Sequence, residues 1–155
     1  MKLTKSETKF WNEYLASLSP ENPPSNYFVE SCPAGNSSMT DGLIALYLSG
    51  KKRAGSSLVE DFEVTGDPLP KVGNYWIVLD GKNQPKLILK TLKIEIHQFR
   101  DVPEYIAIAE GEGDSSLEYW KKTHIDFFKP FLASWDIDNI DDAHVITEFF
   151  ELVWK

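Results

Sequence analysis

The feature that most restricts the fold of this chain is an apolar hairpin near the middle of the sequence. Residues 75–79 (Tyr-Trp-Ile-Val-Leu) form an uninterrupted run of aromatic and branched side chains, which is typical of a buried strand. Asp80-Gly81 follows directly and predicts the turn of a β-hairpin. We expect residues 87–91 to form the returning strand and to continue, bent, through residue 96. The fold must therefore accommodate an antiparallel sheet.

A helix is predicted ahead of this hairpin, over residues 4–18. Thr4 and Glu7 have the spacing of a capping box, in which each side chain accepts a hydrogen bond from the backbone of the other residue. The apolar side chains that follow recur at helical spacing on one face, namely Phe10, Trp11, Tyr14, Leu15 and Leu18. We expect this face to pack against the sheet. Prolines follow the helix, so residues 19–26 are interpreted as a linker.

Further helices and strands are predicted along the rest of the chain. Residues 39–48 have an apolar helical face and end at Gly50, a residue suited to a helix C-terminus. The remaining expectations are a short strand over 27–30, irregular chain over 31–38, short helices near 58–62 and over 104–110, and a final strand over 145–154. This mixture of short strands and flanking helices predicts an α+β fold.

A longer helix is predicted after Asp114 or Ser115, either of which would cap its first turn. Its buried side is expected to carry one tryptophan, one histidine and three phenylalanines: Trp120, His124, Phe127, Phe128 and Phe131. Residues 134–144 are acidic and are expected to form a loop. The helix thus separates a glycine-rich segment from an acidic one.

Length and composition indicate a globular protein. At 155 residues we expect a single domain over residues 1–155, with the helix and linker of residues 1–26 packed on it. No run of about 18 apolar residues is present, so no membrane contact is expected. Cys32 is the only cysteine and the three histidines are scattered, so we expect no internal disulfide, no metal held by Cys or His and no other cofactor. The sequence leaves open whether carboxylates bind a metal. The first residues lack the apolar stretch of a signal peptide, and we expect a cytoplasmic location.

The distribution of charge is uneven. The net charge is -8, which argues against bulk binding of duplex DNA because such proteins need a cationic face. Residues 1–100 carry 12 basic and 11 acidic residues, whereas residues 101–155 carry 4 and 13. The last third therefore holds the acidity, either as a solvated face or as a surface for a basic partner.

Two segments combine residue types that suit ligand binding. The acidic glycine segment, residues 110–114, interleaves three acids with two glycines. The basic segment, residues 49–57, joins two lysines and an arginine to small and hydroxyl side chains. Glycine lets a ligand or another backbone approach closely. We expect the two segments to face each other across one pocket.

Lys52 and Glu112 are the side chains in these segments with the most versatile chemistry. A lysine can anchor a phosphate or polarise a carbonyl group, and a carboxylate between two glycines can contact a ligand or act as a general acid or base. We expect the two to form an ion pair in the empty pocket. The structural alternatives are a solvated Lys52 that stabilises the end of the preceding helix and a Glu112 that stabilises the start of the following one.

The two segments, with two others between them and one after them, resemble the ASCH domain family, a branch of the PUA-like barrels associated with RNA. The resemblance rests on separate motifs in the same order, at residues 48–54, 68–73, 78–81, 109–114 and 116–120. It covers roughly half to two-thirds of the chain. It implies a small PUA-like antiparallel β-barrel with helices packed around it.

The resemblance also implies chemistry, with one departure. Small bacterial ASCH proteins that look like distant relatives are amidohydrolases of acetylated cytidine, and they use a lysine, a threonine three residues later and a later glutamate. Carried over, these are Lys52, Gly55 and Glu112, so the hydroxyl is missing from its position. Ser56 or Ser57 would have to supply it.

Other ASCH proteins are described as ribonucleases. In this sequence the resemblance implies Tyr47, Lys52 and Ser115 or Ser116 for that chemistry.

The hypothesis that follows is a protein that binds RNA or a modified nucleoside in a pocket at the barrel mouth. The expected catalytic or ligand-binding residues are Tyr47, Lys52, Arg53, Ser56, Ser57, Glu110, Glu112, Ser115 and Tyr119. Tyr47, Trp76 and Tyr119 would either stack on a base or belong to the core, and for Trp76, inside an apolar strand, we expect the core. The alternatives are a hydrolase of this family and a non-catalytic module that binds a basic protein through Asp136, Asp138, Asp141 and Asp142. The sequence leaves the oligomeric state open.

Overall fold

The computed structural model describes residues 2–21, 23–25 and 27–155. The chain divides into two compact units. The first unit comprises residues 1–50, 72–92 and 150–155, and the second comprises residues 51–71 and 93–149. The two longest strands, β4 (Pro85–Gln98) and β5 (His144–Trp154), contribute residues to both units. The described strands are hydrogen-bonded in the order β1-β3-β4-β5-β2.

The predicted hairpin forms the sheet of the first unit. β3 (Tyr75–Leu79) pairs antiparallel with β4, as expected, and the pairing is irregular between Val78 and Leu79. The turn is longer than two residues, because β3 ends at Leu79 and β4 begins at Pro85. The Asp80 carboxylate accepts backbone hydrogen bonds from both Lys82 and Gln84. These bonds organise a loop over residues 80–84.

The strand beside the hairpin differs from expectation. β1 is Val29–Pro33, so residues 31–33, predicted to be irregular, are extended. It pairs with β3 in parallel, and the sheet is therefore mixed rather than wholly antiparallel. The Trp76 indole N–H donates to the Cys32 carbonyl oxygen at 3.0 Å, which further ties β1 to β3.

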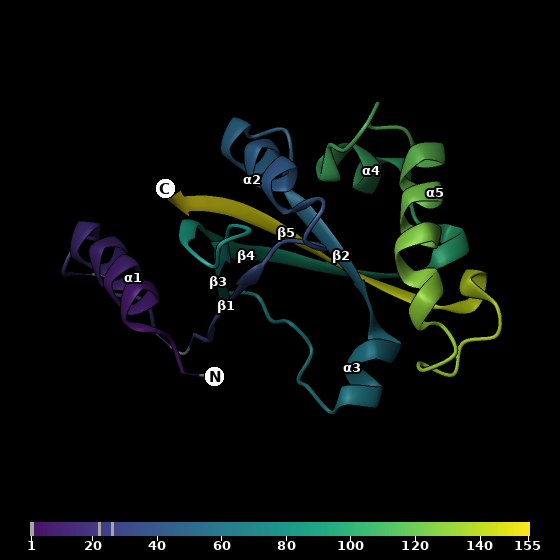
Figure 1. Cartoon of the computed structure of the whole chain (residues 1–155), viewed down its shortest axis with the longest axis horizontal. Helices are drawn as coiled ribbons and strands as arrows, with labels where there is room; N and C mark the ends of the chain where they lie inside the picture. Colours follow the sequence, from purple (N-terminus) through teal and green to yellow (C-terminus); the bar gives the residue numbers. More distant parts are fainter. Residues whose placement is uncertain (1, 22, 26) are drawn as a thin grey trace. The chain divides into compact units, whose positions relative to one another are not determined.

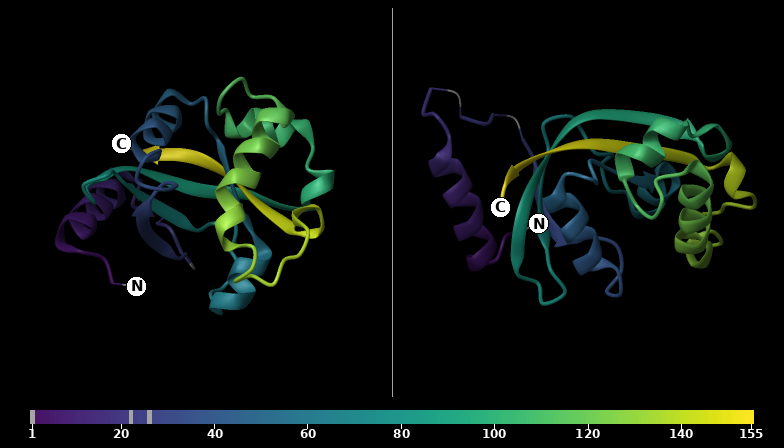
Figure 2. Two further views of the ribbon diagram at one scale, coloured as in Figure 1. Left: turned by 45° about the vertical axis from the view of Figure 1, so that its right-hand side comes forward. Right: turned by 90° about the horizontal axis from the view of Figure 1, so that it is seen from above.

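Two helices pack within the first unit. The capping box of α1 (Lys5–Ser17) is formed by Thr4 and Glu7 as predicted. Its Trp11 and Tyr14 lie in an apolar cluster with side chains of β3 and β4, including Tyr75, Ile77 and Ile88. Figure 2 shows this helix beside the hairpin. The predicted linker over residues 19–26 includes residues 22 and 26, which lie outside the described residues.

The second helix of this unit, α2 (Thr40–Ser49), ends at Gly50 in the left-handed conformation, as the sequence predicts. Tyr47 on α2 is 2% exposed and packs edge-on against Trp76 and Phe150. The ring is a core element of the first unit. A base could stack on Tyr47 only if this packing opened, so the expected ligand-binding role of Tyr47 stays a prediction.

The second unit packs helices against a strand pair. β2 (Ala54–Leu58) pairs antiparallel with β5, with Ser56 opposite Thr147. The helices are α3 (Val59–Thr65), α4 (Glu104–Glu110) and α5 (Leu117–Phe128), with short 3-10 turns at Phe99–Asp101, Lys129–Phe131 and Ile140–Asp142. The core joins Leu58 and Val145 of the strands to buried side chains of the helices, including Phe99, Ile106, Trp120 and Phe128. Figure 1 shows α4 and α5 side by side.

Two predictions about α5 are corrected. The helix is capped by Ser116, whose hydroxyl accepts from the Tyr119 amide at 3.1 Å, and not by Asp114 or Ser115. Ser115 has φ 64°, a left-handed conformation, whereas an N-cap residue is typically extended. Phe131 is 46% exposed rather than buried, because α5 ends at Phe128 and the chain continues as a 3-10 turn.

No helix among the described residues is both long and apolar enough to span a bilayer.

Candidate functional site

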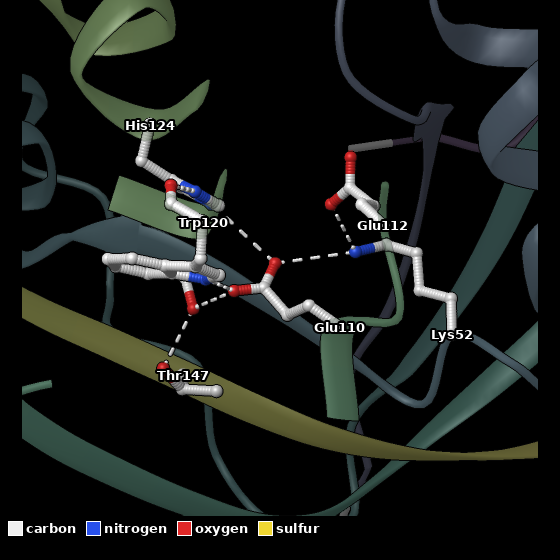
Figure 3. Close-up of polar contacts among 7 residues, drawn as sticks. Lys52, Glu110, Glu112, Trp120, His124 and Thr147 are labelled. Carbon is white, nitrogen blue, oxygen red and sulfur yellow. Dashed lines mark hydrogen bonds and ion pairs between the residues drawn. The ribbon is translucent and has the colours of Figure 1, made fainter. Parts of the chain in front are cut away.

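The buried carboxylate of Glu110 is the centre of a polar cluster in the second unit. Glu110 is the last residue of α4 and is 2% exposed. Lys52 Nζ lies 3.3 Å from Oε1, and the Ser56 hydroxyl donates to Oε2 at 2.9 Å. The indole N–H of Trp120 also donates to Oε2, and His124 Nε2 lies 3.6 Å from Oε1. Figure 3 shows these groups converging on the carboxylate from α5 and from the segment around β2.

Lys52 joins the two segments that the sequence singled out. Its side chain is 4% exposed, and Nζ lies 3.0 Å from Glu112 Oε2 as well as near Glu110. The Glu112 side chain is 22% exposed, so it forms the solvent side of the pair. The predicted contact between Lys52 and Glu112 is present in the structure. The sequence did not indicate that Glu110 would be the more deeply buried partner.

The glycines of the acidic glycine segment allow this approach. Gly111 has φ 63°, and a Cβ added there would lie 2.1 Å from the Lys51 carbonyl oxygen. A side chain at position 111 would therefore clash with the Lys51 backbone, in addition to being strained by the left-handed conformation. The Arg53 amide donates to the Ala109 carbonyl oxygen at 2.7 Å, which fixes the basic segment against the end of α4.

The second glycine makes room for an aromatic ring. Gly113 has φ 57°, and an added Cβ would lie 2.5 Å from the Tyr119 ring. Tyr119 is 41% exposed, so one part of the ring covers the segment while another part meets solvent. The residue after the segment, Ser115, has a left-handed conformation, and its amide donates to the Glu112 carbonyl oxygen at 2.9 Å. Glu112 thus lies between two glycines, one against the Lys51 backbone and the other against the partly exposed ring of Tyr119.

The protonation of Glu110 follows from its surroundings. Burial by itself raises the pKa of the Glu110 carboxyl. The electrostatic interactions of the carboxylate with His124 and Lys52, together with hydrogen bonding to His124 and Trp120, outweigh burial and lower that pKa to about 2. Glu110 is therefore a carboxylate throughout the physiological pH range, and a carboxylate this stable is a weak base.

A second hydroxyl extends the cluster. Ser56 Oγ lies 2.8 Å from Thr147 Oγ1, and Thr147 is fully buried. Because the Ser56 proton is used toward Glu110, the Thr147 hydroxyl donates to Ser56. Sequence inspection missed Thr147, since only the register of β2 against β5 brings it opposite Ser56. It also missed the polar roles of Trp120 and His124, which it predicted only as buried residues of α5.

Other predicted site residues lie outside this cluster. Ser57 follows Ser56 on β2 and is opposite Ile146, so its side chain points to the other face of the strand pair. Its expected catalytic role is therefore not supported by the geometry. Arg53 is exposed beside the cluster. Ser115 contributes backbone geometry rather than a side-chain contact to Lys52.

A small cavity adjoins the cluster. It is lined by Ala107, Glu110, Glu112, Tyr119, Trp120, Thr123 and His124, and its volume is about 10 Å³. That is room for about one water molecule. A larger ligand could enter only if the Glu112 or Tyr119 side chain moved. Among the described residues, no group of three or more His, Cys, Asp or Glu is arranged to hold a metal ion.

Comparison with known proteins places this arrangement in a family. A family model described as the ASCH domain matches residues 30–154. The crystal structure of an ASCH domain from Lactobacillus crispatus JV V101 is 26% identical in sequence, with a TM-score of 0.90 over 100% of this chain and 98% of that one. A protein from Enterococcus faecalis V583 is 33% identical, with a TM-score of 0.82 over 97% and 89% of the two chains. Among curated proteins, no significant match was found.

The chain therefore belongs to the ASCH domain family, which is generally thought to bind RNA. The family and the α+β, PUA-like fold class predicted from the sequence are both confirmed.

Proposed function

We propose that this chain binds RNA or a modified nucleoside at Lys52, Glu112 and Tyr119. The observation that carries the proposal is a buried ammonium shared between a fully enclosed carboxylate and a partly exposed one. Glu110 is enclosed by several donors and acts as a fixed support for Lys52. Glu112 lies on the solvent side, where a ligand can compete for the same ammonium.

The exposed side of the cluster matches the polar edge of a nucleobase. An ammonium donates to a ring nitrogen or carbonyl oxygen, and a carboxylate accepts from an exocyclic amino group. Lys52 and Glu112 supply one of each at adjacent positions. The exposed ring of Tyr119 offers a stacking surface, and a stacked base is worth roughly 1–3 kcal/mol. Arg53, exposed nearby in sequence, would contact a phosphate.

A flexible gate is implied by the size of the cavity. Because it holds about one water molecule, the ligand must displace the Glu112 side chain from its position over Lys52. Gly111 and Gly113 flank Glu112, and each tolerates a wide range of backbone angles. When the ligand binds, the ion pair between Lys52 and Glu112 breaks, and each of these two side chains contacts the ligand instead.

The test is a titration by isothermal calorimetry with short single-stranded RNA and with free nucleosides. We expect binding by the wild-type protein and its loss in Lys52→Met. Lys51→Met, at the adjacent and exposed position, is the matched control, because it removes one positive charge from the same segment while Lys52 keeps its ion pairs with Glu110 and Glu112. Equal binding by both variants, with each shown to be folded by circular dichroism, would contradict the proposed site.

A hydrolase is the second candidate, and the contact between Ser56 and Glu110 favours it. Ser56 donates to that carboxylate at 2.9 Å and is half-buried, so it places a hydroxyl beside Lys52 although position 55 is glycine. In this version Ser56 Oγ attacks the acetyl carbonyl carbon and Lys52 stabilises the oxyanion. The C–N bond then breaks, the departing cytidine nitrogen takes the Ser56 proton, and water hydrolyses the acetyl-serine to acetate and free Ser56. The low pKa of Glu110 makes it a poor proton acceptor, which is why binding is preferred.

The hydrolase is tested by release of cytidine from 4-acetylcytidine. Turnover by the wild type that is lost in both Ser56→Ala and Lys52→Met would establish it. The matched control is Ser57→Ala, which removes a hydroxyl from the opposite face of the strand pair. Absence of turnover in a folded protein that binds nucleosides would leave binding as the function.

A further inference from the structure

A second carboxylate, that of Glu95 on β4, holds three side chains at the other end of α4. The Glu95 side chain is 15% exposed. The hydroxyl of Tyr105, on the first turn of α4, donates to Glu95 Oε1, and His97 Nε2 lies 3.0 Å from the same oxygen. Lys93 Nζ lies 3.0 Å from Oε2. Glu95 therefore ties the start of α4 to β4, as Glu110 ties its end to β2.

Hydrogen bonding within this group keeps Glu95 ionised and Tyr105 protonated. Burial by itself raises the pKa of the Glu95 carboxyl, but hydrogen bonds from Tyr105, Lys93 and His97 outweigh burial and lower that pKa to about 2. The bond to Glu95 in turn raises the pKa of the Tyr105 phenol. At neutral pH the phenol therefore donates to a carboxylate, and this bond restricts the orientation of the Tyr105 ring.

The side chains that Glu95 holds are exposed to solvent. Tyr105 is 49% exposed, and the Lys93 side chain is 65% exposed. Lys93 Nζ also lies 5.5 Å from the centre of the Phe149 ring, so an aromatic face lies beneath the ammonium. An ammonium has three N–H donors, and Lys93 can therefore bond a phosphate oxygen while it keeps its ion pair with Glu95. Ile108, one turn after Tyr105, is exposed as well and extends the apolar surface of α4.

Lys93 lies on the same side of the sheet as the polar cluster around Glu110. Phe149 and Thr147 are two residues apart on β5, so their side chains point to one face of that strand. Lys93 lies over the Phe149 ring, and Thr147 contacts Ser56. The Ser56 hydroxyl donates to Glu110. The two groups of side chains therefore belong to one face of the sheet in the second unit.

The separation of the two groups suits a short single strand of nucleic acid. Tyr105 and Glu110 are five residues apart on α4, which is roughly 8 Å along the helix axis. Lys52 and Glu112 lie at the end of the same helix. Proteins that bind single strands combine aromatic rings that stack on successive bases with cations that follow the phosphates. A ligand of several nucleotides can therefore extend from Lys52 to Tyr105.

We propose that Tyr105 and Lys93 form a second subsite, which binds a neighbouring nucleotide of a single-stranded RNA. Tyr105 stacks on the base, and Lys93 contacts the phosphate. Glu95 is a positioning residue, which holds both side chains and does not touch the ligand. The inference rests on the proposed function and narrows its ligand, because a free nucleoside bound at Lys52 does not reach this subsite. The ligand is therefore an oligonucleotide.

The first test compares a free nucleoside with a single-stranded RNA of about six nucleotides by calorimetry. We expect the RNA to bind the wild type more tightly than the nucleoside does. Tyr105→Leu should lower the affinity for the RNA by about fivefold or more, through the loss of one stacked base. Tyr105→Phe keeps the ring but loses the bond to Glu95, so its loss should be smaller. The affinity for the nucleoside is the internal reference.

The second test uses salt, because a purely structural role of Lys93 would not change the salt dependence of binding. Each phosphate contact on a single strand adds about 0.7 to the slope of log affinity against log salt concentration. We expect Lys93→Met to reduce the slope for the RNA by about that amount. Lys90→Met is the matched control, since Lys90 is also on β4 and its ammonium lies 5.7 Å from the centre of the Tyr75 ring. The control should leave the slope unchanged.

The outcomes separate this inference from the proposed function, once circular dichroism has shown that each variant is folded. An RNA affinity unchanged in Tyr105→Leu, with an unchanged salt slope in Lys93→Met, would overturn the second subsite and leave the site at Lys52 standing. RNA binding that is lost in Tyr105→Leu but kept in Lys52→Met would support the second subsite and contradict the proposed function. If neither the RNA nor the nucleoside binds the wild type, both are wrong.

Discussion

The backbone of Gly111 lies directly against the carbonyl oxygen of Lys51, so closely that an added Cβ would come within 2.1 Å of it. This contact brings the two segments together and sets the distance between Lys52 and Glu112. We expect Gly111→Ala to destabilise the protein by about 2–4 kcal/mol, through left-handed strain and displacement of the Lys51 backbone. Urea unfolding monitored by circular dichroism measures this loss in the free energy of unfolding.

The control for this prediction is Gly66→Ala. Gly66 ends α3 with φ 77°, and an added Cβ there would meet nothing within 4 Å. Its substitution should cost only the conformational strain, about 1 kcal/mol. Equal losses for the two variants would show that the approach of Gly111 to Lys51 has no special role.

The stability of the fold should depend on the buried carboxylate of Glu110. Replacing it with glutamine removes the buried anion beside Lys52, which keeps only the partly exposed Glu112 as its ionic partner, and we expect a loss of about 3–5 kcal/mol. Glu118→Gln is the control, because Glu118 is exposed on the first turn of α5 and its substitution should stay within about 0.5 kcal/mol. Thermal unfolding of the two variants and the wild type compares their stabilities. If the Glu110→Gln protein were as stable as the Glu118→Gln control, the buried carboxylate would not stabilise the fold and the prediction would be wrong.

The same carboxylate predicts a dependence of stability on pH. The pKa of Glu110 is lowered in the folded state, to about 2. Its contribution is therefore present above the unfolded-state pKa and is lost as pH falls from that value through about 2. At neutral pH it amounts to roughly 3 kcal/mol. Urea unfolding of the wild type and Glu110→Gln between about pH 7 and pH 3 should show a shallower decline for the variant. If the stability of the wild type and of Glu110→Gln fell in parallel as the pH was lowered, the lowered pKa of Glu110 would be contradicted.

Tyr119 should contribute stacking to ligand binding. It is exposed above the acidic glycine segment, and its ring covers Gly113. We expect Tyr119→Leu to weaken nucleoside or RNA binding by roughly 1–3 kcal/mol, while Tyr119→Phe keeps most of the affinity. Calorimetric titration of the two variants separates the aromatic face from the hydroxyl. Equal affinities of Tyr119→Leu and the wild type would exclude Tyr119 from the interface.

The sequence predicted the parts of this site that depend on local residue types. Glycines among acids indicated a close approach, and the structure places Lys52 beside Glu112 as expected. The roles of the two acids could not be separated, because burial of Glu110 depends on how α4 packs. Thr147 was missed because pairing between β2 and β5 joins residues 91 positions apart.

The same limit applies to the fold. The capping box of α1 and the left-handed end of α2 are local features and were predicted correctly. The parallel pairing of β1 with β3 joins distant segments and leaves no local signal. The cap of α5 was misplaced because Asp114, Ser115 and Ser116 are all residues that favour this position, and only the backbone angles distinguish them.

The most direct test of the central claim is an NMR titration of the labelled wild-type protein with single-stranded RNA and with nucleosides. The Trp120 indole N–H, which donates to Glu110, and the amides of Gly111 and Gly113 report on the site. We predict that these signals shift with ligand, while the Trp11 indole in the α1 cluster and the Gly66 amide do not. Shifts confined to other parts of the protein, or no shifts with any of these ligands, would contradict a binding site at Lys52 and Glu112.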